Sequence, residues 1–215
     1  NAFSGIKGVF TSPYLLGIAG FIALMTFAST ILYFAQSDLV YSAMTDRGER
    51  TAFLAKIDLT VNILTIVFEV YLTARLIRWL GVGLTLAVIP AAVAVGFLAL
   101  GVYPTLATLV VVQIIYRAGR YGMTKPAREI LFTVVSREEK YKSKAFIDAA
   151  VYRGGDLVSG WIYAGLAFVG LSLGTIAMLA APVAAMWAIL GIRVAAKGDV
   201  KAAEMESEKV TMPVA

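Results

Sequence analysis

The amino-acid sequence predicts an all-α, polytopic membrane protein with six transmembrane helices. Of its 215 residues, 60% are hydrophobic and only 15% are charged, whereas soluble domains are about 45–50% apolar and about 25% charged. A soluble core of this length could not bury so many apolar side chains, so part of the surface must face lipid. The apolar residues also fall into runs of about 20, which is the length that crosses a bilayer as a helix.

Six such runs follow one another along the chain, and each is predicted to be one span. They cover residues 14–34, 56–80, 83–101, 105–121, 142–169 and 171–194. The second has charged residues at both ends, the third has none, and the fifth begins as an amphipathic segment near Lys142. The turn at residues 102–104 is so short that the third and fourth spans must be antiparallel. Pro90 and Pro182 lie inside spans, where neighbouring helices can satisfy the freed backbone groups.

The remaining segments and the positive charges predict the orientation. Residues 122–143 form the longest predicted loop, and residues 196–215 form a polar tail. With six spans, both termini and this loop lie on one side, which holds 16 of the 19 Lys and Arg. The positive-inside rule assigns that side to the cytoplasm. We therefore expect cytoplasmic termini, contact with membrane lipids, and anionic lipid headgroups bound on the cytoplasmic side.

The composition argues against most kinds of catalysis. The sequence has no Cys and no His, which excludes thiolate chemistry, the usual zinc sites and a Ser-His-Asp triad. Asp148 and Asp156 are eight residues apart, so they lie roughly 12 Å apart along a helix axis, too far for shared acid–base work. We expect no enzyme, no cofactor, no metal site and no nucleic-acid partner.

Polar stripes within the spans indicate a passage through the bundle. The second span carries Asp58, Asn62, Thr65, Glu69 and Thr73 at helical spacing on one face. Glu69 stands out because an intramembrane carboxylate is costly: it either lines a cavity or forms a structural ion pair or hydrogen bond. Further stripes occur in the first, fourth and fifth spans. Four striped and two plain helices would form half of a bundle around a polar passage.

The stretch from Tyr116 to Asp156 concentrates positive charge at the cytoplasmic side. Lys125-Pro126 is expected to end the fourth helix, because Pro disfavours helix in the residue before it. Residues 127–135 then read as an amphipathic interfacial helix. The charge either follows the positive-inside rule and binds anionic lipid, or it forms a cytoplasmic mouth that attracts a polyanion, with Arg as the preferred phosphate partner.

Two segments resemble known transporter families. Residues 72–81 (LTARLIRWLG) resemble the cytoplasmic loop between helices two and three, and eight and nine, of the major facilitator superfamily. Residues 125–129 (KPARE) and 142–148 (KSKAFID) resemble the loop between helices ten and eleven of the nucleotide transporter (ATP/ADP translocase) family and its bacterial transporter-like homologues. Lys125 stands where that family has Asp. The matching positions are Pro126, Arg128, Glu129, Lys142, Lys144 and Asp148.

The resemblance implies that the six spans form the C-terminal half of a twelve-helix bundle, in a bacterial cytoplasmic (inner) membrane. The two halves would exchange nucleotides or another organic anion by alternating access. Arg117 and Arg120 would receive the anion, and Glu69, Asp148, Arg153 and Asp156 would form ion pairs that break and reform. Because the sequence starts at Asn1 rather than Met, we expect an N-terminal six-helix half or partner membrane chains. The alternative is a non-transporting scaffold subunit of a larger membrane complex.

Overall fold

The computed structural model describes residues 9–211, apart from the side chains at 138, 139 and 208–211, and this part of the chain contains helices and no β-strand. The predicted all-α class is therefore confirmed. The elements are α2 (Pro13–Ala43), α3 (Arg47–Val67), the π-helical turn η1 (Phe68–Leu72), α4 (Thr73–Val102), α5 (Leu106–Gly119), the π-helical turn η2 (Arg120–Thr124), α6 (Lys125–Leu131), the 3-10 turn η3 (Phe132–Val134), α7 (Arg137–Phe146), the π-helical turn η4 (Ile147–Val151), α8 (Tyr152–Phe168) and α9 (Leu173–Thr211).

Short polar side chains define where the long helices begin. The Ser12 hydroxyl accepts the Leu15 N–H at the start of α2, and the Asp46 carboxylate accepts the Glu49 N–H at the start of α3, at 2.7 Å. Thr105 caps α5 in the same way. Each cap satisfies a backbone donor that has no partner within its helix.

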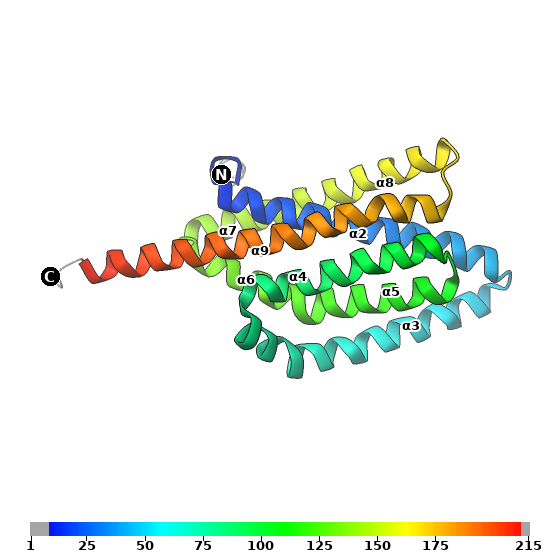
Figure 1. Cartoon of the computed structure of the whole chain (residues 1–215), viewed down its shortest axis with the longest axis horizontal. Coiled ribbons are helices and arrows are strands. Elements are labelled where there is room, and N and C mark those ends of the chain that lie inside the picture. Colours follow the sequence, from blue (N-terminus) through cyan, green and yellow to red (C-terminus); the bar gives the residue numbers. More distant parts are fainter. Residues whose placement is uncertain (1–8, 212–215) are drawn as a thin grey trace.

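The long helices lie side by side along the long axis of the molecule (Figure 1). The helical run from α3 through η1 continues into the first turns of α4, and the chain then reverses at Gly81. Gly81 has φ +76°, a left-handed conformation that glycine adopts without steric cost. This reversal falls between residues 80 and 83, where the sequence predicted the boundary between the second and third spans.

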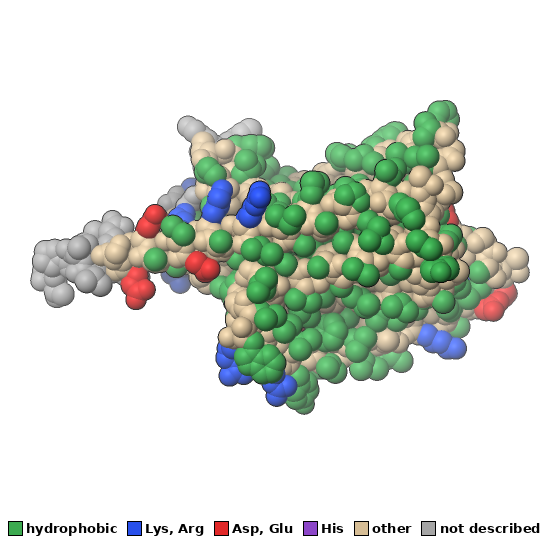
Figure 2. Space-filling view, in the orientation of Figure 1, with side chains coloured by type: hydrophobic (Ala, Val, Ile, Leu, Met, Phe, Trp, Pro, Cys, Tyr) green, Lys and Arg blue, Asp and Glu red, His purple; other side chains and the backbone are tan. Residues whose placement is uncertain are grey.

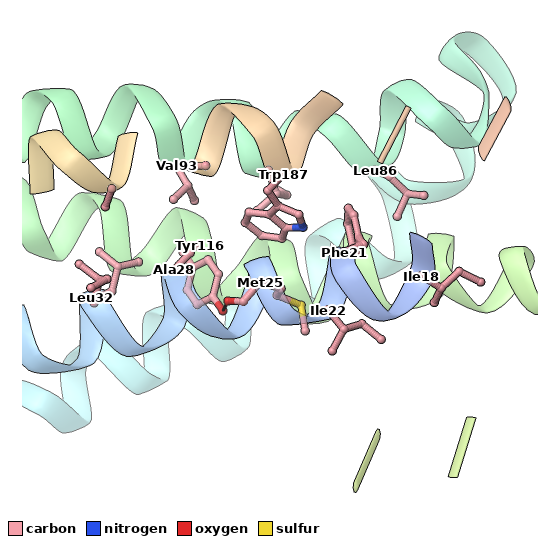
Figure 3. Close-up of a cluster of buried hydrophobic side chains, with 14 of the residues drawn as sticks. Ile18, Phe21, Ile22, Met25, Ala28, Leu32, Leu86, Val93, Tyr116 and Trp187 are labelled. Carbon is pink, nitrogen blue, oxygen red and sulfur yellow. Dashed lines mark hydrogen bonds between the residues drawn. The ribbon is translucent and has the colours of Figure 1, made fainter. Parts of the chain in front are cut away.

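Aromatic side chains from three helices form the centre of the core (Figure 3). Trp187 of α9 is fully buried; its ring centroid lies 5.5 Å from that of Phe21 in α2 and 6.5 Å from that of Tyr116 in α5. The Tyr116 hydroxyl donates a hydrogen bond to the Met25 carbonyl at 3.1 Å. The contacts tie α2, α5 and α9 together at a fixed spacing.

The helices α3 and α8 each bury only a narrow face against this core. The buried residues of α3 are Ile57 and Val61, and those of α8 are Ser159 and Tyr163. Large apolar side chains such as Trp161 are exposed. Figure 2 shows hydrophobic side chains over the middle of one face, with Lys and Arg gathered toward its ends. This distribution is that of a protein whose middle faces lipid.

Three continuous helical stretches in the described chain are long and apolar enough to cross a membrane: Pro13–Ala43, Arg47–Val102 and Leu173–Ser207. The second includes the reversal at Gly81, so it contains two antiparallel segments. The structure thus supports an integral membrane protein, and the six-span topology stays a prediction. The predicted N-terminal cytoplasmic segment begins in residues 1–8, which lie outside the described residues, as do residues 212–215 of the predicted tail.

The expectation that Lys125-Pro126 ends the fourth helix is wrong. The backbone stays helical from α5 through η2 into α6, with Lys125 at φ −63° and ψ −54°. Pro126 has no N–H to donate to the carbonyl four residues earlier, which is that of Gly122. The Thr73 hydroxyl donates to that carbonyl instead, at 2.5 Å. A side chain from another helix therefore supplies a donor where proline has none, and the predicted loop 122–143 is largely helical.

Candidate anion-binding site

A cavity of about 280 Å³ opens where α5 gives way to η2, and we call it the basic cavity. Arg120, Tyr121 and Thr124 come from η2, and Lys125 and Arg128 come from α6. Asp148 of η4, Tyr152 of α8 and Met25 of α2 complete the lining. Three cations and one carboxylate line it, which leaves a formal net charge of +2.

Arg120 is held by tyrosines rather than by a carboxylate. Its guanidinium donates to the Tyr152 hydroxyl at 2.6 Å and to the Tyr116 hydroxyl at 3.4 Å. It also lies 5.3 Å and 5.2 Å from the ring centroids of Tyr121 and Tyr152, within cation–π range. Among the described residues, no carboxylate lies within 4.0 Å of it. These neutral partners fix the position of Arg120 and leave its charge uncompensated.

Arg128 is mostly buried, and it is only loosely paired. Its side chain is 12% exposed, and Nη2 lies 3.5 Å from Asp148 Oδ1 and 3.9 Å from Glu129 Oε1. Charge-assisted hydrogen bonds are usually about 2.7–2.9 Å long. Glu129 instead receives two such bonds from Lys144 Nζ, at 2.7 and 2.9 Å. The strong ion pair near Arg128 is therefore Lys144–Glu129, and the guanidinium of Arg128 still has N–H groups available to a ligand.

Unpartnered buried polar atoms gather around the cavities. Among the described side chains, four buried polar atoms make no hydrogen bond: Thr65 Oγ1, Thr124 Oγ1, Arg128 Nε and Trp187 Nε1. Thr124 and Arg128 line the basic cavity. Thr65 lines an adjoining cavity of about 480 Å³, together with Glu69, Glu129 and Pro126, and the two cavities share Tyr121 and Lys125. Leaving such a group unpaired costs about 1–3 kcal/mol, so a ligand that supplies acceptors is stabilised here.

All three π-helical turns contribute residues to these cavities. Arg120, Tyr121 and Thr124 belong to η2, Asp148 to η4 and Glu69 to η1. In η2 the Lys125 N–H bonds to the Arg120 carbonyl five residues earlier. The turns η1 and η2 also touch: a Cβ added at Gly122 would lie 2.7 Å from Phe68 Cβ. Single π-helical turns within α-helices are frequent at functional sites.

The structure brings some of the predicted site residues together and separates others. Arg120, Arg128 and Asp148 line the basic cavity, Glu69 and Glu129 line the adjoining one, and Lys144 pairs with Glu129. Lys144 itself lines neither cavity. Three further predicted residues lie away from both cavities: Arg117, which pairs with Asp58 at 2.6 Å; Arg153, which is exposed; and Asp156, which accepts a hydrogen bond from Thr30 at 3.4 Å and lines a separate groove beside Trp161.

Five residues of the basic cavity were not among the predicted site residues: Met25, Tyr121, Thr124, Lys125 and Tyr152. Helical spacing identifies three of them: Thr124 follows Arg120 by four residues, Tyr152 follows Asp148 by four, and Lys125 precedes Arg128 by three. Tyr121 directly follows Arg120 within the π-helical turn η2.

Comparison with protein-family models, with curated proteins and with solved structures finds no match to this chain. The resemblance to nucleotide transporters therefore stays a prediction. What the site can bind has to be argued from its own chemistry. Three cations, one loosely held carboxylate and two unpartnered donor groups make it a candidate site for an anion with several oxygen acceptors.

Proposed function

We propose that this chain forms one half of a membrane transporter that exchanges organic anions, nucleotides among them, by alternating access. The observation that carries the proposal is the basic cavity. It has a net charge of +2, it contains Arg120 with no carboxylate partner, and it has unpartnered buried groups on Thr124 and Arg128. Phosphate and carboxylate groups supply the oxygen acceptors that arginine forks bind best.

The position of the cavity supports a role at the cytoplasmic entrance. The first turn of α2 lies beside α6 and α9, because the Tyr14 hydroxyl donates to the Leu131 carbonyl at 2.6 Å and Lys201 Nζ lies 5.6 Å from the Tyr14 ring centroid. The basic cavity, bounded by α6, is at the end of the bundle where α2 begins and α9 ends (Figure 1). In the six-span topology this is the cytoplasmic end, where a positive field would attract anions from the cytoplasm.

The weakly attached helices fit a half that works with a second half. In transporters built from two repeats, the substrate binds near the midplane between them, and the repeats move largely as rigid bodies. The core formed by α2, α4, α5 and α9 provides a rigid body, while α3 and α8 expose most of their surfaces. A second half packed against these two helices would enclose the cavities between the halves.

Exchange by the full-length protein in liposomes tests the proposal. Vesicles preloaded with ATP or succinate would be assayed for uptake of the same radiolabelled anion, with the wild type compared with Arg120→Gln. Hydrogen bonds to charged groups contribute about 1.5–3 kcal/mol, so uptake at a subsaturating concentration should fall about ten- to a hundredfold. Arg78→Gln is the matched control, because Arg78 is exposed, lines neither cavity, and donates only to the Ala74 carbonyl of its own helix.

Two outcomes would contradict the proposal. If Arg120→Gln and Arg78→Gln exchange anions equally well, the basic cavity is not on the transport path. If the folded wild-type protein exchanges neither anion, the result favours the scaffold alternative, in which the bundle serves to bind other membrane chains. Size-exclusion profiles and melting temperatures of each variant separate loss of exchange from loss of folding.

A further inference from the structure

We propose that Asp148 is a built-in competitor that occupies Arg128 when the basic cavity is empty and is displaced when an anion binds. The inference rests on the proposed function, because it takes the basic cavity to be an anion site. It concerns how that site is regulated: the carboxylate of the protein and the oxyanion of the ligand would exclude each other at one guanidinium.

The geometry of the guanidinium carries the argument. Arginine binds an oxyanion most strongly through two parallel N–H groups, and Nε with Nη2 forms one such pair. In Arg128 the Nε atom is buried and makes no hydrogen bond, while Nη2 faces Asp148 Oδ1 at 3.5 Å. A ligand that binds both nitrogens would compete with Asp148 for Nη2. The unpartnered Nε and the Nη2 that faces Asp148 are the two halves of one binding edge.

Burial and distance show which partner is able to move. The side chain of Arg128 is 12% exposed, whereas that of Asp148 is 44% exposed. Rehydrating the Asp148 carboxylate is therefore easier than moving the guanidinium. The contact of 3.5 Å is also longer than a charge-assisted hydrogen bond, so a phosphate or carboxylate at 2.7–2.9 Å would bind Arg128 more strongly. A residue that served only to position Arg128 would make a closer contact.

The cavity offers no second carboxylate for this role. Asp148 is the one carboxylate among the described residues that line the basic cavity, where Arg120 and Lys125 have no carboxylate within 4.0 Å. Glu129 lies farther from Arg128 Nη2, at 3.9 Å, does not line the basic cavity, and already accepts two hydrogen bonds from Lys144. Losing Asp148 alone would therefore raise the charge available to a ligand and leave the neighbouring ion pair intact.

Displacement would also loosen one link between α6 and α8. Asp148 lies in η4, the π-helical turn that leads directly into α8, and its contact with Arg128 joins that turn to α6. The rest of α8 is held against α2 by the hydrogen bonds from Tyr163 to Asp38 and from Thr30 to Asp156. Anion binding would thus remove this one link, while the hydrogen bond from Arg120 to Tyr152 still holds the first residue of α8.

Equilibrium binding to the purified full-length protein tests the inference. The probes are ATP, succinate and inorganic phosphate, titrated calorimetrically into wild type and Asp148→Asn at one ionic strength. Exposed ion pairs contribute about 0.2–1 kcal/mol, so removal of the competitor should tighten binding by up to about fivefold. Asp58→Asn is the matched control: it also takes a carboxylate from an arginine, Arg117, which lines neither cavity, so binding should not change.

A double variant shows whether the effect passes through Arg128. In an Arg128→Gln background, Asp148→Asn should give no further gain in affinity, because there is no guanidinium to compete for. A gain of the same size in both backgrounds would overturn the inference in favour of a general change in charge. Asp148→Ser repeats the test if Asp148→Asn lowers the melting temperature so far that the protein does not fold.

The outcomes separate this inference from the proposed function. If the wild type binds a probe and Asp148→Asn binds it equally or more weakly, Asp148 does not compete, and the proposed function stands without this inference. If neither protein binds any of the three probes, the basic cavity is not an anion site, and both proposals fail. Tighter binding by Asp148→Asn than by the wild type, with no such gain in the Arg128→Gln background, supports the inference.

Discussion

Gly119→Ala should destabilise the bundle, because Gly119 is where α5 packs most tightly against α4. Gly119 is the last residue of α5 and immediately precedes Arg120. A Cβ built there would collide with Ile89 Cδ1 and would lie 2.6 Å from Ile89 Cγ1. Ile89 is 3% exposed and is followed by Pro90 inside α4. Moving Cγ1 needs a change of Ile89 χ1, and χ1 of a β-branched residue in a helix is restricted to essentially one rotamer.

The size of the effect follows from two opposing terms. Overpacking a core costs about 1–3 kcal/mol, and two overlapping atoms place Gly119→Ala toward the upper end of that range. Replacing Gly by Ala inside a helix stabilises the helix by about 1 kcal/mol through its higher helix propensity. We expect a net loss of about 2 kcal/mol in the free energy of unfolding. Because Arg120 is the next residue, the displaced helix end should also weaken anion binding.

A double variant makes this reasoning specific to one contact. Ile89→Ala alone should cost about 2–5 kcal/mol through the cavity that it leaves. In Gly119→Ala/Ile89→Ala the new methyl group enters the space of the deleted side chain. The combined loss should therefore be smaller than the sum of the single losses by about 1–3 kcal/mol, within the range found for residues in contact.

The assay is equilibrium unfolding in mixed micelles, followed by the fluorescence of the tryptophans, of which Trp187 is fully buried. Gly154→Ala is the control: a Cβ at Gly154 would meet no atom within 4 Å, so this change should stabilise the helix by up to about 1 kcal/mol. The reasoning is refuted if Gly119→Ala is as stable as Gly154→Ala, or if the losses from Gly119→Ala and Ile89→Ala simply add.

Two further variants probe the attachment of α8 to α2. Tyr163→Phe removes the hydrogen bond to Asp38 and should cost about 1 kcal/mol in the same unfolding assay; an unchanged midpoint would show that this bond contributes nothing. Gly155→Ala should cost about 1–3 kcal/mol, because its Cβ would collide with the Thr26 hydroxyl and lie 3.2 Å from Thr26 Cβ. Adding Thr26→Ala to Gly155→Ala should restore most of the lost free energy of unfolding. If it does not, the strain does not arise from the contact with Thr26.

The arrangement of helices could be predicted where local signals agree with the tertiary structure. Apolar runs located the long helices, and the break between the second and third spans coincides with the reversal at Gly81. The end of the fourth helix could not be predicted, because the backbone preference of the residue before Pro126 was overruled by Thr73 on another helix. No local pattern records a hydrogen bond between residues 49 positions apart.

The site shows the same division between local and tertiary information. Charges close to the membrane boundary identified Arg120, Arg128 and Asp148, which do line one cavity. Arg117 and Arg120 were both expected to receive the anion. In the structure Arg117 reaches Asp58 on α3 and Arg120 reaches Tyr152 on α8. Residues three apart differ by about 60° around a helix, so they share a broad face without having to share a partner.

The positive charge was interpreted either as positive-inside charge that binds lipid headgroups or as a cytoplasmic mouth for a polyanion, and the two interpretations differ in the burial that they predict. Cations that only follow the positive-inside rule or bind lipid headgroups belong on the surface, as Arg75 and Arg78 are. Arg128 is 12% exposed, its Nε has no partner, and it lies beside a cavity that also contains Arg120 and Lys125. Burying a cation with an unsatisfied donor costs stability that surface placement would avoid. Under the proposed function, an anion bound inside the basic cavity would offset this cost, which headgroups at the outer surface would not.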